Sequence, residues 1–163
     1  MALDDSLKST LIKNRQERAL LQYVDYSDKV PDSVKMNQLQ NLIHDTLIST
    51  DHVQSCAIVN RADASVKASS VGFSLFSDQV IALIEAFKSP SQTREEGIYF
   101  NDKQYKCVRA DKFSIYAKDG NKGLVVIKTA TLLLVATYSE VMKPSICVEA
   151  VEKLAEYFRE KGK

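Results

Sequence analysis

Strand-like segments follow one another in the C-terminal half of the chain, with very short links between them. Apolar runs predict five strands: Gly97–Asn101, Gln104–Ala110, Phe113–Lys118, Gly123–Thr129 and Leu132–Ser139. These links are shorter than the roughly twelve residues that a helical crossover between parallel strands needs. The strands are therefore expected to turn back on themselves as an antiparallel meander. The polar sequences between them, Asn101-Asp102 and Asp119-Gly120-Asn121, suit tight turns.

One amphipathic helix is predicted after the meander, over Ser145–Glu160. Its expected buried face is formed by Val148, Val151, Leu154, Ala155 and Phe158. Glu149 and Lys153 are four residues apart and are expected to pair on its exposed side. Gly162 suits the position after the last turn. A helix that follows a meander is expected to cover one face of that sheet.

The middle of the chain predicts two more helices and a hairpin. A helix is expected to open at Met36, with an apolar face made of Leu39, Leu42, Ile43 and Leu47. A central strand over Val53–Asn60, a turn at Asp63-Ala64 and a weaker strand over Ser65–Ser69 follow.

A further helix is expected to start at a cap, Ser77 or Asp78. Its apolar stripe comprises Val80, Ile81, Leu83, Ile84 and Phe87. Pro90 is expected to stop this helix from resuming, which leaves Ser91–Glu96 as a charged loop.

Residues 1–35 differ from the rest of the chain. The spacing of their apolar residues predicts a helix over Asp4–Tyr23, and Asp28–Ser33 reads as a polar linker interrupted by Pro31. Two interpretations are open: a frayed, solvated extension, or a regulatory helix that docks on the domain.

Composition favours an ordinary globular protein. The 163 residues suit one domain, and a net charge of +1 predicts neither nucleic-acid binding nor general attraction to membranes. Cys56, Cys107 and Cys147 are odd in number and widely spaced, which indicates reduced thiols rather than a disulfide framework. No apolar run is long enough to span a membrane, and the acidic N-terminus is unlike a signal peptide, so a cytoplasmic location is expected.

Signatures of catalysis are missing from the sequence. His44 and His52 have no partnered serine or cysteine motif, and they are expected on a helix surface and in a loop. The five glycines form neither a dinucleotide fingerprint nor a phosphate-binding loop, and no set of metal ligands has the required spacing. We therefore expect a protein that is not an enzyme and that needs no metal or other cofactor.

The predicted meander is locally basic. Residues 103 to 128 include seven basic and two acidic side chains, for a local charge of +5 (7 − 2). The basic residues are Lys103, Lys106, Arg109, Lys112, Lys118, Lys122 and Lys128. One reading is a binding surface for an acidic protein or an anionic lipid headgroup. The other is ordinary solvation of a sheet face by lysines that discourage aggregation.

Three stretches of the chain resemble profilins. They are residues 103–109, the hairpin and strand of residues 115–129, and Met142–Cys147 with the following Val151–Leu154 and Tyr157. Order and spacing agree from Met36 to Lys163. Within the family, Val108–Asp111 and Leu134–Tyr138 resemble most the divergent, testis-type members.

The resemblance implies an α+β fold for residues 36–163, with residues 1–35 as an N-terminal extension that is partly helical or disordered. A central antiparallel sheet would carry the N- and C-terminal helices on one face and a shorter helix on the other. It also implies three family activities: binding of monomeric actin, of Pro-rich segments and of phosphoinositides.

Two of these activities are expected to be weak or absent. Profilins bind polyproline on aromatic side chains of the paired terminal helices, but this chain has no tryptophan and keeps only Tyr157 and Phe158 there. The positions that match the actin face are Arg109, Lys118, Lys128 and Glu149. Tyr116 stands where an arginine is usual, and the loss of a bidentate donor predicts weak actin binding or none.

Lipid binding is expected to persist, because it needs clustered positive charge more than exact geometry. The resemblance implies acidic phospholipids as partners, phosphoinositides or phosphatidic acid, and a role in cytoskeletal remodelling during sperm development. The candidate headgroup contacts are Lys106, Arg109, Lys112, Lys118 and Lys128. Two alternatives are open: an actin-monomer-binding profilin that regulates polymerisation, and a protein-interaction scaffold of similar sandwich fold.

Overall fold

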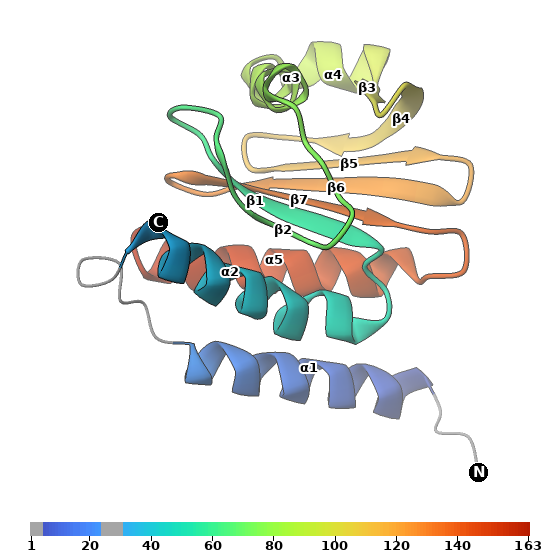
Figure 1. Cartoon of the computed structure of the whole chain (residues 1–163). Coiled ribbons are helices and arrows are strands. Elements are labelled where there is room, and N and C mark those ends of the chain that lie inside the picture. Colours follow the sequence, from blue (N-terminus) through green and yellow to red (C-terminus); the bar gives the residue numbers. More distant parts are fainter. Residues whose placement is uncertain (1–4, 24–30) are drawn as a thin grey trace.

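A single antiparallel sheet forms the centre of the molecule (Figure 1). The computed structural model describes residues 5–23 and 31–163. Its strands are β1 (Ser55–Asn60), β2 (Val66–Ser69), β3 (Ile98–Phe100), β4 (Lys103–Ala110), β5 (Ser114–Asp119), β6 (Lys122–Lys128) and β7 (Leu132–Tyr138). They lie in the order β2-β1-β7-β6-β5-β4-β3, and each neighbouring pair is antiparallel. The predicted meander, from β3 to β7, is confirmed.

Helices cover both faces of this sheet. They are α1 (Asp5–Gln22), α2 (Asp32–Thr46), the short 3₁₀ turn η1 (Ile48–Thr50), α3 (Ser77–Lys88), α4 (Pro90–Glu96) and α5 (Pro144–Glu160). Figure 1 shows α2 and α5 side by side on one face, and α3 with α4 at the other. The expected α+β arrangement is therefore confirmed. In Figure 1, α1 forms a further layer outside α2 and α5.

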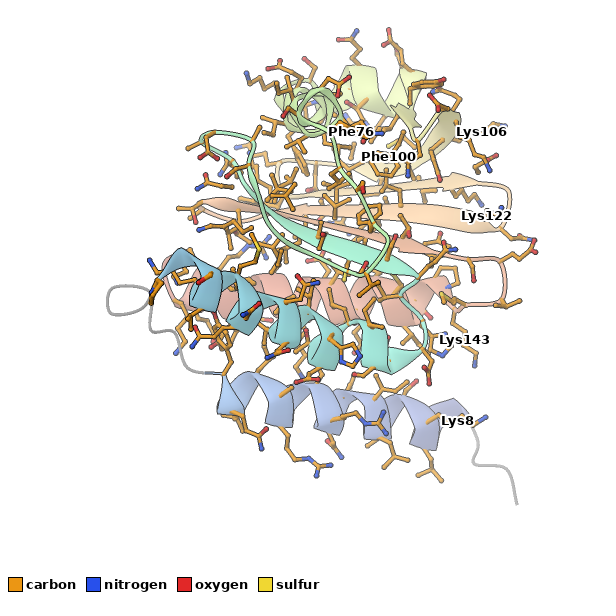
Figure 2. The ribbon with its side chains drawn as sticks, viewed as in Figure 1. Lys8, Phe76, Phe100, Lys106, Lys122 and Lys143 are labelled. Carbon is orange, nitrogen blue, oxygen red and sulfur yellow. The ribbon has the colours of Figure 1, made fainter. Side chains whose placement is uncertain are left out.

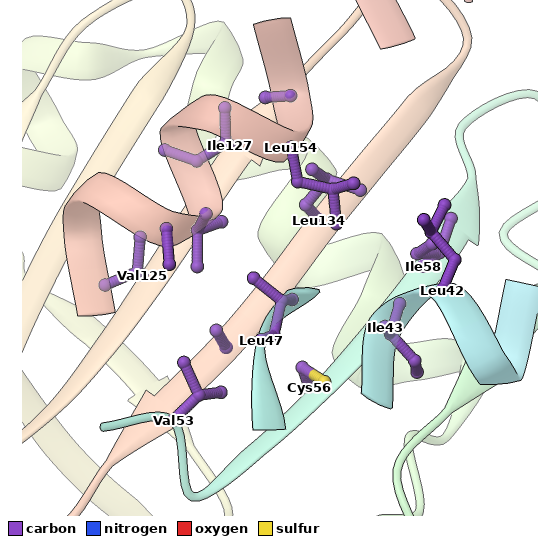
Figure 3. Close-up of a cluster of buried hydrophobic side chains, with 14 of the residues drawn as sticks. Leu42, Ile43, Leu47, Val53, Cys56, Ile58, Val125, Ile127, Leu134 and Leu154 are labelled. Carbon is purple, nitrogen blue, oxygen red and sulfur yellow. The ribbon is translucent and has the colours of Figure 1, made fainter. Parts of the chain in front are cut away.

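The hydrophobic core is divided by the sheet into two clusters. On the α5 side, Ile58, Val125, Ile127 and Leu134 of the sheet meet α2 and α5 (Figure 3). The partners are Leu42 and Ile43 of α2, Leu47 directly after it, and Val151, Leu154 and Phe158 of α5. On the α3 side, Val80, Leu83 and Phe87 pack on Val126, Leu133 and Val135. The predicted stripes are thus correct, except that Ile81 is half exposed.

The last turn of α5 ends as the sequence predicts. The Lys163 N–H donates to the Phe158 carbonyl at 2.9 Å, and the Gly162 N–H donates to the Arg159 carbonyl at 3.0 Å. Gly162 has a φ of 74°, the left-handed conformation that this Schellman arrangement requires. The free carbonyl groups at the end of the helix are satisfied in this way.

The start of α2 differs from the prediction. The helix begins at Asp32 rather than at Met36, because the Pro31 carbonyl accepts the N–H groups of Val34 and Lys35. Proline is tolerated in the first turn, where its missing N–H costs nothing. The segment predicted as a linker therefore contributes its last residues to α2, and residues 28–30 and Asp4 lie outside the described residues.

The segment after Pro90 is a helix, so its prediction as a charged loop is wrong. Pro90 occupies the first turn of α4, and its ring favours helix initiation there. Thr93 Oγ1 donates to the Ala86 carbonyl at 2.7 Å, and Arg94 Nη1 donates to the Ala110 carbonyl at 2.5 Å. The proline that ends α3 thus starts α4.

The predicted cap of α3 is also wrong. Ser77 is already the first helical residue, and Phe76 takes the capping position with no side-chain oxygen of its own. The Phe76 N–H instead donates to Gln79 Oε1 at 3.1 Å. A glutamine one turn into the helix therefore satisfies this donor in place of Ser77 or Asp78.

The register of β6 and β7 places Gly123 directly opposite Tyr138. A Cβ atom added to Gly123 would lie 1.9 Å from Cζ of the buried Tyr138 ring. We predict that Gly123→Ala lowers the free energy of unfolding by about 1–3 kcal/mol through overpacking. In a Tyr138→Leu background the same change should cost much less, because the ring is gone. Urea unfolding of the four chains measures this, and an equal cost in both backgrounds would contradict the clash.

Candidate functional site

The basic residues predicted to bind lipid lie at different places on the sheet. Lys106 and Lys118 are direct neighbours across β4 and β5, and both are exposed. Figure 2 shows Lys106 on the same side of the molecule as Lys122 and Lys143. The structure therefore brings Lys106 and Lys118 together, but it does not gather all five predicted residues.

A β-bulge decides the direction of Arg109. Cys107 pairs with Ala117 and Arg109 pairs with Tyr116, so Val108 is an extra residue in β4. Without the bulge, strand alternation would place Arg109 on the same face as Cys107, toward α3. With it, the Arg109 guanidinium lies over the Tyr116 ring, 5.5 Å from its centroid, on the side of α5.

Arg109 is held by the carboxylate of Asp111. Arg109 Nε donates to Asp111 Oδ2 at 2.9 Å, and Nη2 lies 2.8 Å from the same oxygen. This bond and the charge of Asp111 raise the pKa of Arg109. Burial opposes ionisation of Asp111, but the N–H groups of Phe113 and Ser114 and the Arg109 guanidinium outweigh it, so the pKa of Asp111 is lowered. The charge of Arg109 is thereby largely neutralised.

A shallow polar hollow of about 490 Å³ lies between the β4–β5 turn and α5. Ser114 Oγ and Tyr116 Oη both donate to Glu152 Oε1, at 2.7 and 2.6 Å. Burial and this bond to a carboxylate raise the pKa of Tyr116 to about 12, so its hydroxyl remains a donor. The same hollow is lined by Arg159 and Phe113, with the Arg159 guanidinium 5.5 Å from the centroid of the Phe113 ring.

A second group of cations meets at the end of the sheet where β6 turns into β7. Arg61 Nη1 donates to the carbonyls of Thr129 and Ala130, at 2.7 and 2.8 Å. Arg159 Nη2 donates to the Lys128 carbonyl at 2.9 Å. Burial lowers the pKa of Lys128, and the charges of Arg61 and Lys112 lower it further. We call Arg61, Lys112, Lys128 and Arg159 the basic end cluster.

Lys128 does not share a face with Lys106 and Lys118. Leu124 and Val126, its alternate neighbours on β6, pack toward α3, and the Lys128 ammonium lies 5.6 Å from the centroid of the Phe87 ring. Because side chains alternate between the two faces of a strand, moving Lys128 to the α5 side would also move Leu124 and Val126 away from the α3 core.

Sequence reasoning missed Arg61 and Arg159. Arg61 follows β1 directly and Arg159 lies in the last turn of α5, so both are far in sequence from the meander. Each side chain donates to backbone carbonyls, and no pattern of side chains along the sequence predicts such contacts. The one sequence signal was the position of each arginine at or just after the end of a predicted strand or helix.

The candidate residues on α5 are partly engaged by α1. Glu149, predicted to face actin and to pair with Lys153, instead binds Lys13 at 2.6 Å, and Lys153 binds Glu17. The prediction of a Glu149–Lys153 pair is therefore wrong, because each side chain finds a partner on another helix.

The two aromatic residues predicted as a polyproline remnant have different environments. Phe158 is 2% exposed and belongs to the core. The Tyr157 ring packs edge to face against Tyr23, with 6.1 Å between centroids.

Within residues 5–23 and 31–163, no three His, Cys, Asp or Glu side chains are placed to hold a metal ion. The cysteines are free, and burial raises the pKa of Cys56 and Cys147 to about 12, which keeps them as thiols. In the same residues, no helix is long and apolar enough to cross a membrane.

Comparison with known proteins agrees with this geometry. The Profilin family model matches residues 37–163. Bovine Profilin-4 is 53% identical over 128 residues, which cover 78% of this chain and 99% of that protein, and mouse Profilin-4 is 52% identical over the same coverage. The chain belongs to the profilin family. Among solved structures, profilin II of Acanthamoeba castellanii aligns with a TM-score of 0.71 and 32% identity, over 76% of this chain and 98% of that one.

Membership places the chain among cytoplasmic, cytoskeleton-associated regulators of actin, a family of binding proteins rather than enzymes. The likeness to one divergent branch of the family, inferred from short runs of sequence, is confirmed by the identity of more than 50% to Profilin-4 of two mammals. The matched region begins at residue 37, within α2, so the whole of α1 lies outside it.

The Arg109–Asp111 contact predicts a pH dependence. Because the folded state lowers the pKa of Asp111, its contribution is complete above the unfolded pKa near 3.8 and disappears as the pH falls through the folded value. We predict that Asp111→Asn lowers stability at neutral pH by about 0.5–1 kcal/mol, since the pair is partly screened by solvent. The free energies of unfolding of the unmodified and Asp111→Asn chains should converge as the pH falls below 3.8. A difference that stays constant with pH in urea unfolding would contradict this account.

Proposed function

We propose that this profilin-family protein acts on the cytoskeleton mainly through reversible binding of acidic phospholipids. The observation that supports this most is the basic end cluster. None of its four members forms a salt bridge with the residues that the structure describes, and Lys128 is held near Arg61 and Lys112 despite their mutual repulsion. The nearby carboxylates, Asp111 and Glu152, line the same hollow as Lys112 and Arg159 but are bonded to other groups. Cations that lie close together without a salt bridge of their own favour a multivalent anion from outside.

The chemistry of the cluster suits a phosphorylated headgroup. Arg61 and Arg159 are fixed by backbone carbonyls, so their guanidinium groups lose little freedom on binding an anion. Lys112 is exposed at the β4–β5 turn and adds a mobile charge. Lys106 and Lys118 provide a second, smaller site on the α5 side, whereas Arg109 is already paired with Asp111.

Polyproline binding is proposed to be weak or absent. The surface that Pro-rich ligands would need is the outer side of the paired terminal helices, and α1 lies over it. Among residues 5–23 and 31–163, Phe158 lies in the core and Tyr157 packs against Tyr23, so these two positions offer no pair of exposed aromatic rings to stack on proline.

Actin binding is likewise proposed to be weak. Of the residues that match the family's actin face, Arg109 is paired with Asp111 and Glu149 with Lys13, while Lys128 lies on the other face of the sheet. An incoming partner would have to break these pairs, which lowers its net affinity. We extend the proposal to developing sperm on the likeness to testis-type members alone.

The lipid proposal predicts a difference between the two ends of the sheet. The full-length chain should sediment with vesicles that contain acidic phospholipids at low salt, and much less at high salt. Removing two of the cluster's four charges with Lys112→Gln and Lys128→Gln should weaken binding to the vesicles about thirtyfold, given ~1 kcal/mol per basic residue near the membrane and ~1.4 kcal/mol per tenfold change in affinity. The matched pair Lys106→Gln and Lys118→Gln removes the same charge elsewhere and should have a smaller effect. Failure of the unmodified chain to sediment would refute lipid binding.

A pyrene-actin assembly assay tests the actin proposal. At equimolar concentration, the chain should slow assembly far less than a profilin that binds actin monomers tightly. The contacts of Arg109 and Glu149 give the reason, since both side chains already have partners. Strong sequestration of monomers would overturn this ranking and favour the alternative of an actin-monomer-binding profilin.

A further inference from the structure

The helix α1 contacts α5 through two ion pairs in a fixed register. Lys13 binds Glu149 at 2.6 Å, and Glu17 binds Lys153 one turn further along both helices. The numbering rises in the same direction on both sides, so α1 runs parallel to α5. A helix in the opposite direction would bring Lys13 toward Lys153, and two like charges would face each other.

Between the ion pairs lies a buried polar contact. Gln16 is 2% exposed, and its Nε2 donates to the Ala150 carbonyl at 2.8 Å. This carbonyl belongs to the middle of α5 and gains a second donor from outside its helix. Gln16, one residue before Glu17, is therefore part of the recognition. A shorter side chain would not reach the Ala150 carbonyl, and an apolar side chain could not donate a hydrogen bond to it.

Fully buried apolar contact is found only at the C-terminal end of the described part of α1, whereas Ile12 in the middle of the helix is partly buried beside Ile146 and Ala150 of α5. Leu20 is 8% exposed and joins the core cluster on the α5 side, and Tyr23 packs on Tyr157. By contrast, Leu21 is 84% exposed. From the described part of the first 23 residues, Leu20 is the sole fully buried member of that cluster, whereas α2 and α5 supply many.

These contacts make α1 the outermost and least deeply anchored helix of its face. Segments held by few buried apolar groups open at a lower free energy than the core. Polar and ionic contacts give direction and register rather than strong adhesion. An arrangement that is specific but weakly held suits exchange of one helix for another.

We propose that the outer face of α2 and α5 is a binding site for an amphipathic helix, with α1 as its occupant in the resting chain. When α1 opens, the site admits a helical segment that carries the same pattern, Lys-x-x-Gln-Glu-x-x-Leu, in the direction parallel to α5. The residues that read this pattern are Glu149, the Ala150 carbonyl and Lys153. This recognition is independent of lipid binding.

The experiment uses the full-length chain with Leu20→Ala, and Leu21→Ala as a matched control on the neighbouring exposed residue. Hydrogen exchange should accelerate in α1 of the Leu20→Ala chain at least tenfold, with β6 and β7 unchanged, and should stay as in the unmodified chain for Leu21→Ala. A labelled peptide of residues 5–23 should then bind the Leu20→Ala chain saturably and bind the other two chains far more weakly. The same peptide with Lys13→Glu and Glu17→Lys should bind about tenfold more weakly, since both ion pairs become repulsive.

A second route opens α1 without touching the core. The full-length chain with Lys13→Glu and Glu17→Lys should also bind the unmodified peptide, and adding Glu149→Lys with Lys153→Glu should close α1 again and abolish that binding. If α1 exchanges together with β6 in every chain, α1 does not open by itself and the proposal fails. If α1 opens but the peptide does not bind, the face is not a helix-binding site and the proposal fails as well.

Discussion

Burial of β6 and β7 on both faces is the constraint on which the remaining structure depends. Leu124 and Val126 point to one side and Val125 and Ile127 to the other, and all four are fully buried. Apolar side chains on both faces of a strand oblige the sheet to carry a cover on each side, because either face left in water would lose the free energy of burial. The chain supplies α2 with α5 for one face and α3 with α4 for the other.

This double cover explains where the charges can lie. Positive side chains are excluded from the sandwiched middle of the sheet and collect where strands end or emerge from under the helices. Lys106 and Lys118 are exposed neighbours on β4 and β5, and Lys112 and Lys128 lie where strands end. The local excess of seven basic residues over two acidic ones is real, but the sheet divides it between two faces and two ends. A single broad basic face, as a count along the sequence suggests, does not form.

The helix α1 depends on the domain in a different way from the other helices. Its contacts with α5 are mainly polar. They fix the direction and register of α1 along α5 more than they contribute to the free energy of unfolding. It occupies the side of the molecule on which the paired terminal helices would otherwise face solvent. A frayed extension and a docked helix, the two interpretations of the N-terminal residues, differ in whether these contacts form. The loosely spaced apolar residues of the sequence between residues 5 and 22 were compatible with both.

The sequence by itself determined the elements whose signals are local and repeated: the five-strand meander, the stripe of α5 that contains Leu154, and the Gly162 stop, since each follows from side-chain period or backbone freedom. The prediction of a loop after Pro90 was wrong, because a proline that ends one helix can also occupy the first turn of the next. Only the tertiary structure decided which side chains meet. The bulge at Val108 turned Arg109 to the α5 side, and Arg61 reached the β6–β7 turn through carbonyl groups that any residue possesses. Such contacts depend on where separate segments lie in space, and no periodicity along one chain encodes that distance.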